Sequence, residues 1–138
     1  MSEKHSIVIE EYLLLLYQLR GAGERLKAVT LAQRLKNSAP TVHATLQRMQ
    51  RDDLIQMDDK KEINLTKEGE RLACDIAFRH NLAEYFLCNT LGIPWYEVYK
   101  HAHQLEHAMN PTVVDKLAAF LNYPETCPHG TLMPVHSL

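Results

Sequence analysis

The chain has few of the features that mark secreted, membrane or unstructured proteins. Its 138 residues include only three cysteines, an odd number that argues against a disulfide-stapled secreted fold. The apolar run Leu13 to Tyr17 is far too short to cross a membrane, and the polar start of the chain contains no signal-peptide core. With 46% hydrophobic and 23% charged residues, the composition is that of one folded domain or two small ones. We therefore expect a cytoplasmic protein with no membrane partner.

An excess of charge of one sign is also lacking. The 15 basic and 17 acidic residues give a formal net charge of −2, which argues against a protein that coats nucleic acid by bulk charge alone. Histidine, by contrast, is abundant, with eight residues. Because histidine is a common metal ligand, the positions of these residues decide whether the chain holds a metal site.

The apolar periodicity predicts a mostly α-helical chain with one β-hairpin. Capping residues mark several helix starts: Thr30 with Gln33 forms a capping box, Ser38 precedes Pro40, and Asn110 precedes a proline. The expected helices cover residues 7–19, 30–35, 39–51, 67–90, 94–109 and 111–121, and the expected strands cover 54–57 and 62–65. Two close helices followed by a hairpin are typical of a winged helix-turn-helix, although other small α+β domains share this order.

A local basic segment supports nucleic-acid binding. Residues 26–61 carry seven basic and four acidic side chains inside a net negative chain. Small and hydroxyl side chains early in the third helix would let that helix sit close in a major groove. For Arg48 and Arg51, a solvent-exposed helix face with an ion pair to a neighbouring aspartate is the alternative. The DNA-binding candidates are Lys27, Ser38, Pro40, Thr41, His43, Thr45, Gln47, Arg48, Arg51, Lys60 and Lys61.

Histidine and glutamate recur at helical spacing in the second half of the chain. His103, Glu106 and His107 lie at positions i, i+3 and i+4, which places all three on one helix face. His80 and Glu84 lie four residues apart on the preceding helix. Two helices that both contribute His and Glu side chains can build a metal site. Mixed nitrogen and oxygen donors favour manganese, iron, cobalt or zinc over calcium or magnesium. The tail adds a weaker Cys-x-His motif at Cys127 to His129.

Six short segments together resemble one known family over nearly the whole chain. They are Glu11-Tyr12-Leu13, Ser38-Ala39-Pro40-Thr41-Val42, Arg48-Met49-Gln50-Arg51-Asp52, Arg79-His80-Asn81-Leu82-Ala83-Glu84, His103-Gln104-Leu105-Glu106-His107 and Thr126-Cys127-Pro128-His129-Gly130. The sequence resembles the diphtheria toxin repressor and manganese transport regulator family of metal-dependent transcriptional regulators. The resemblance implies a winged helix-turn-helix DNA-binding domain over 1–66 and a helical metal-binding and dimerisation domain over 67–138.

The resemblance also implies a ligand set. Glu11 stands where the iron branch has Met and the manganese branch Asp, and His103 stands where they have Cys and Glu, so the preferred metal stays open. The iron branch uses a histidine where this chain has Tyr99. The implied primary metal ligands are Glu11, His80, His103, Glu106 and His107, and the implied ancillary ligands are Glu84, Cys127 and His129.

The function implied is repression of metal homeostasis genes by a homodimer that binds double-stranded operator DNA. Mn(II) or Fe(II) is the expected cofactor, with Co(II) and Zn(II) as alternatives. We expect neither enzyme activity, a small-molecule substrate, nor the C-terminal SH3-like domain that family members often add. Candidate dimer contacts are Phe86, Leu87, Trp95 and Tyr96. The competing interpretations are a helical metalloenzyme or metal-storage protein, and a winged-helix regulator without a metal response.

Overall fold

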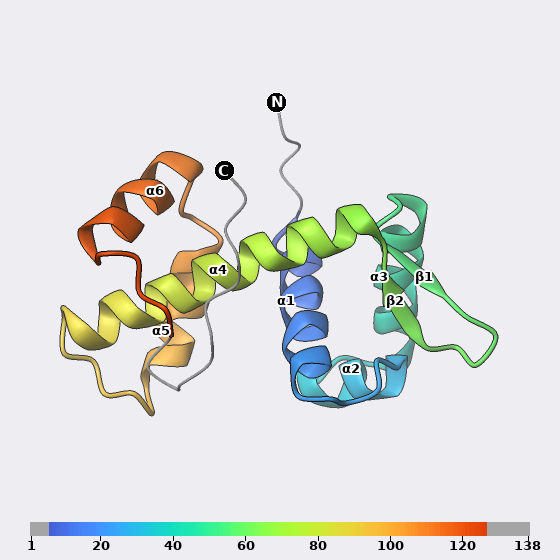
Figure 1. The fold of residues 1–138 in the computed structure, drawn as a ribbon. Coiled ribbons are helices and arrows are strands. Elements are labelled where there is room, and N and C mark those ends of the chain that lie inside the picture. The colour runs from blue at the N-terminus through green and yellow to red at the C-terminus, as the bar shows by residue number, and fades with distance from the viewer. Residues whose placement is uncertain (1–5, 127–138) are drawn as a thin grey trace. The chain divides into compact units, whose positions relative to one another are not determined.

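The computed structural model describes residues 6–126 (Figure 1). They divide into two compact units, of which the first ends at Ala73 and the second begins at Cys74. The described residues form helices α1 (Ile7–Gly21), α2 (Ala28–Leu35), α3 (Ala39–Arg51), α4 (Lys67–Asn89), α5 (Val98–Glu106) and α6 (Pro111–Phe120), and strands β1 (Ile55–Met57) and β2 (Ile63–Leu65). The mostly helical fold with one hairpin is therefore confirmed. No helix within residues 6–126 is long and apolar enough to span a membrane.

The first unit is built on the buried faces of α1 and α3. The Ser6 side chain caps α1 by accepting a hydrogen bond from the backbone N–H of Ile9 at 3.2 Å. At the start of α3, the Ser38 hydroxyl accepts from the backbone N–H of Thr41 at 3.3 Å, and Pro40 occupies the first turn. The buried side chains that α3 contributes include Val42, Leu46 and Met49, whose spacing of four and three residues places them on one helix face.

The two strands form an antiparallel hairpin in which Ile55 pairs with Leu65 and Met57 with Ile63. Ile55 and Ile63 are buried while Gln56 is exposed, which is the alternation expected of a strand with one face on the core. In the connecting turn, the Asp58 carboxylate accepts the backbone N–H groups of residues 60 and 62, both at 2.9 Å. These bonds lower the pKa of Asp58 and leave residues 60 and 61 exposed at the tip of the hairpin.

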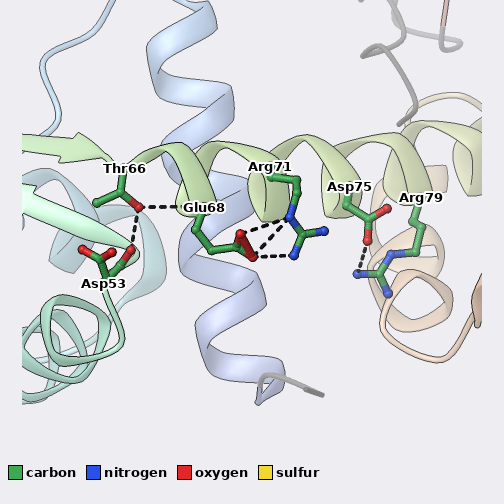
Figure 2. A network of polar contacts seen from close by, with 7 residues as sticks. Asp53, Thr66, Glu68, Arg71, Asp75 and Arg79 are labelled. Carbon is green, nitrogen blue, oxygen red and sulfur yellow. Dashed lines mark hydrogen bonds and ion pairs between the residues drawn. The ribbon is translucent and has the colours of Figure 1, made fainter. Parts of the chain in front are cut away.

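Thr66 fastens the first turn of α4 to the segment that follows α3 (Figure 2). Its hydroxyl donates a hydrogen bond to the Asp53 carbonyl at 2.6 Å and accepts one from the Gly69 N–H at 3.0 Å. The Thr66 N–H also donates to the Leu54 carbonyl at 3.0 Å. One residue therefore caps α4 and joins it to the backbone beyond α3.

Replacing Thr66 with alanine is expected to lower the free energy of unfolding by about 1–2 kcal/mol, the usual cost of losing an N-cap side chain. Thr66→Ser keeps the hydroxyl and is the matched control. Urea unfolding followed by far-UV circular dichroism measures both variants. Equal losses in the alanine and serine variants would show that the two hydroxyl hydrogen bonds contribute nothing.

The second unit packs α5 and α6 against residues of α4 through two apolar clusters. Phe78 and Leu82 of α4 are buried with Val114 and Ala118 of α6. The other cluster buries Ala83 and Leu87 of α4 with Val98 and Ala102 of α5. Helix α6 begins as expected at Asn110, whose side chain accepts from the backbone N–H of Val113 at 2.9 Å. Because α5 packs on α4, polar residues that lie between these apolar positions on one helix also face the other helix.

The limits of two helices differ most from the expectation. Helix α2 begins at Ala28 with Lys27 as its N-cap and no side-chain capping bond, so the capping box of Thr30 with Gln33 is wrong. Helix α5 covers only Val98–Glu106 rather than residues 94–109. The N–H groups of residues 108 and 109 both bond to the Leu105 carbonyl, which tightens and ends the last turn of α5.

Candidate metal centre and nucleic-acid face

Three ionisable side chains are buried together in the second unit. His80 and Glu84 of α4 are 1% and 2% exposed, and Glu106 at the end of α5 is 0% exposed. Ionisable groups are rarely buried so completely unless they are paired or bind an ion. The expected juxtaposition of the α4 pair with the α5 cluster is therefore present in the structure.

His80 lies between the two carboxylates. Its Nδ1 atom makes a short contact with Glu106 Oε1, and its Nε2 atom lies 3.3 Å from Glu84 Oε2. Burial on its own lowers the pKa of His80, but hydrogen bonds and charge from Glu106 and Glu84 outweigh it and raise the pKa to about 9. The resemblance assigns Glu106 and Glu84 to different metal sites, and the structure shows that one imidazole contacts both.

The other oxygen of Glu106 faces two further histidines. Oε2 lies 3.4 Å from His103 Nδ1 and 3.5 Å from His107 Nε2. This buried oxygen accepts no hydrogen bond from any residue that the structure describes. Ligand atoms around one divalent ion, at bond lengths of about 2.1 Å, lie about 3 to 3.5 Å apart. Each of the two histidine nitrogens thus lies at about a ligand-to-ligand distance from the Glu106 oxygen, and donors of these types suit a transition metal.

Aromatic contacts surround these ligand candidates. The Tyr99 ring meets the His80 ring edge-on with centroids 4.7 Å apart, and it lies parallel to the His103 ring at 6.4 Å. The His103 and His107 rings are 5.1 Å apart. Tyr99 stands out in the sequence only because the iron branch of the family has a histidine at this position. Its position four residues before His103 was the available signal that the two rings would be neighbours.

Three further candidate ligands do not belong to the described part of the second unit. Glu11 is half-buried on α1, in the first unit. Cys127 and His129 lie outside the described residues. Their assignments to the primary and ancillary sites therefore stay predictions.

Most of the candidate DNA-binding side chains are accessible in the first unit. Arg51 forms an ion pair with Asp52 at 3.1 Å, which is the alternative arrangement that the sequence left open for it. Thr45 requires a correction, because it is 5% exposed and its hydroxyl donates to the Thr41 carbonyl at 3.2 Å, so it is not available to a DNA base. The exposed candidates are Ser38, Pro40, Thr41, His43, Gln47, Arg48, Arg51, Lys60 and Lys61, and Lys27 is half-buried.

The chain belongs to the iron-dependent repressor family. Residues 5–63 match the family's N-terminal DNA-binding domain, and residues 66–135 match its metal-binding and dimerisation domain. The resemblance inferred from the short motifs is thereby confirmed.

Individual relatives give the degree of similarity. The iron-dependent repressor IdeR of Mycobacterium tuberculosis is 38% identical over 125 residues, which are 91% of this chain and 54% of the relative. Among solved structures, the manganese regulator SloR is 35% identical with a TM-score of 0.84, and the match covers 94% of this chain and 60% of that one. A manganese-dependent transcriptional repressor in complex with manganese is 30% identical with a TM-score of 0.86, and covers 92% and 58%. The chain thus spans about half the length of the curated relatives it matches.

Proposed function

We propose that this chain is a divalent-metal-dependent transcriptional repressor that binds operator DNA as a homodimer. The observation that carries the proposal is the buried Glu106 carboxylate, which faces ring nitrogens of His80, His103 and His107 in a chain that also has a winged helix-turn-helix unit. The family is one of repressors rather than enzymes, which favours this function over a metalloenzyme or a storage protein. We propose that the protein acts in the cytoplasm and represses genes of metal homeostasis.

The residues that would hold the metal are the primary set, His80, His103, Glu106 and His107, together with Glu11. Glu84, Cys127 and His129 would form the ancillary set. A bound Mn(II) or Fe(II) supplies a double positive charge that offsets the buried carboxylates, and Co(II) or Zn(II) can supply the same. Glu106 contacts His80 through one oxygen and faces the His103 and His107 rings with the other, so its carboxylate is the group that lies next to all three histidines.

The DNA-binding domain would be residues 1–66, with α3 as the helix that enters the major groove. The exposed early residues of α3, among them Thr41, His43 and Gln47, would face base edges. Arg48 directly follows Gln47 on α3, and Lys60 and Lys61 lie at the tip of the hairpin. These three cations would contact phosphates, which fix position rather than sequence.

The dimer contacts would come from residues 67–138. Trp95 and Tyr96 are 60% and 71% exposed, and large exposed aromatic side chains favour a protein interface. Leu87, another sequence candidate, is 5% exposed and belongs to the apolar cluster within the chain, so it is not part of the proposed interface. Phe86 is half-buried against the same cluster.

Selection from a random-sequence duplex library tests the proposal. With Mn(II) present, the protein should enrich a short palindromic site, because a two-fold dimer reads two half-sites about one helical turn apart. The same selection with EDTA should give no enrichment. Equal enrichment with Mn(II) and with EDTA would contradict metal control, and no enrichment with Mn(II), Fe(II), Co(II) or Zn(II) would contradict DNA recognition.

A further inference from the structure

Arg79 connects α4 to the end of α5 in the second unit. Its guanidinium donates a hydrogen bond from one terminal nitrogen to the backbone carbonyl of Glu106 at 2.9 Å. Its other terminal nitrogen lies 3.5 Å from Asp75 Oδ2, one turn earlier on α4 (Figure 2). The Arg79 side chain is 13% exposed, whereas Asp75 is 44% exposed. Arg79 therefore pairs with the Asp75 carboxylate and points its cation at the backbone of a candidate metal ligand.

The carbonyl that Arg79 contacts lies at the carboxyl end of α5. Glu106 is the last residue of the helix, and the final carbonyls of a helix have no partner within it. The carboxyl end of a helix also carries partial negative charge, which a cation stabilises. Glu106 and His107, the two residues joined by this peptide group, are both candidate ligands. Any rotation of that peptide would move both side chains.

We propose that Arg79 is a positioning residue for the metal centre, which fixes the peptide between Glu106 and His107 before any ion binds. This inference rests on the proposed metal-binding function. Arg79 touches no metal in this scheme, since a guanidinium has no lone pair to offer a cation. It acts through the backbone, with Asp75 holding the guanidinium in place.

Arg71 provides a matched comparison on the same helix. It forms an ion pair with Glu68, three residues earlier, and its side chain is 53% exposed (Figure 2). Both arginines thus pair with a carboxylate one turn before them on α4. Arg79 in addition donates a hydrogen bond to the α5 backbone. A surface pair of the Arg71 kind contributes little to stability.

The test is a Co(II) titration of the full chain and its variants, read by visible absorption. Arg79→Met keeps the apolar stem and removes the donors, Arg79→Lys keeps a charged donor, Asp75→Asn loosens the guanidinium, and Arg71→Met is the control. Loss of an outer-shell partner typically weakens metal binding 10–100-fold. We expect Arg79→Met to weaken Co(II) binding about ten-fold and to change the d–d spectrum, with Asp75→Asn intermediate and Arg79→Lys closer to the wild type.

Several outcomes separate positioning from a purely structural role. If Arg79→Met lowers the unfolding midpoint of the metal-free chain but leaves the Co(II) affinity and spectrum unchanged, the positioning role is wrong. If Arg71→Met weakens Co(II) binding as much as Arg79→Met, the effect is not specific to the α5 contact and the proposal is again wrong. If the wild-type chain binds no Co(II), Mn(II), Fe(II) or Zn(II), the proposed function itself fails. If the wild type binds Co(II) and the Arg79→Met and Asp75→Asn variants bind it with the same affinity, the positioning role of Arg79 is wrong while the proposed function stands.

Discussion

Replacing Glu106 with glutamine is expected to weaken Mn(II) binding about 100-fold or more, beyond the effect usual for an outer-shell partner. The substitution keeps the size of the side chain but removes its negative charge. It also replaces one oxygen by an amide nitrogen that cannot ligate a cation. Because the carboxylate contacts His80 and lies within 3.5 Å of His103 and His107, the change affects every candidate ligand of the second unit that surrounds it. Metal-dependent DNA selection should be lost together with the affinity.

The matched control is Glu97→Gln, the same chemical change on an exposed residue at the start of the same helix. Isothermal titration calorimetry with Mn(II) gives the affinity, and circular dichroism checks that both variants fold. The control should bind Mn(II) as the wild type does. If the Glu106→Gln variant folds and binds Mn(II) with wild-type affinity, the metal binds elsewhere and the proposed metal centre is wrong.

The fold could be predicted from the sequence where local signals decide the structure. The caps at Ser38 and Asn110 fix the starts of α3 and α6, and alternation around Asp58 defines the hairpin. The limits of α2 and α5 could not be predicted in the same way. Neither helix start has a side-chain capping bond in the structure, so tertiary packing rather than a local motif sets these limits.

The sequence predicts which candidate ligands share one face of a helix, but it does not predict how close two helices lie. Spacing on one helix places His103, Glu106 and His107 on one face, but no spacing rule gives the distance from α5 to His80 on α4. The shared contact of His80 with two carboxylates therefore emerges only from the packed structure.

Thr45 and Arg79 show two different limits of sequence reasoning. Thr45 lies three residues after Val42 and four before Met49, and both of these residues are buried. Helical spacing therefore favours a buried Thr45, whereas its hydroxyl group favours a contact with a DNA base. For Arg79, the aspartate four residues earlier is at the spacing at which two side chains of one helix form an ion pair. Its second partner is a backbone carbonyl on another helix, and side-chain patterns carry no information about such a group.

Replacing Gly69 with alanine is expected to lower the free energy of unfolding by about 3 kcal/mol, at the upper end of the usual cost of overpacking. A Cβ atom built at Gly69 would lie 1.9 Å from the Leu54 carbonyl oxygen and 2.9 Å from the Leu54 carbonyl carbon. Both are backbone atoms, so no side-chain rotation can relieve the clash. The helix must move away from Leu54, which strains the hydrogen bond from the Thr66 N–H to the same carbonyl.

Gly21→Ala is the control, because a Cβ atom at Gly21 would meet no atom within 4 Å and the residue ends α1. An alanine there should leave stability unchanged or raise it by up to about 1 kcal/mol, since glycine is the poorer helix former. Urea unfolding followed by circular dichroism compares the two variants. A Gly69→Ala variant as stable as the wild type would mean that α4 does not approach Leu54 closely. The contacts of Thr66 with residues 53 and 54 would then be absent as well, because they depend on the same approach. The two substitutions therefore test one feature from two sides: Thr66→Ala removes the bonds that fasten α4, and Gly69→Ala removes the space that lets them form.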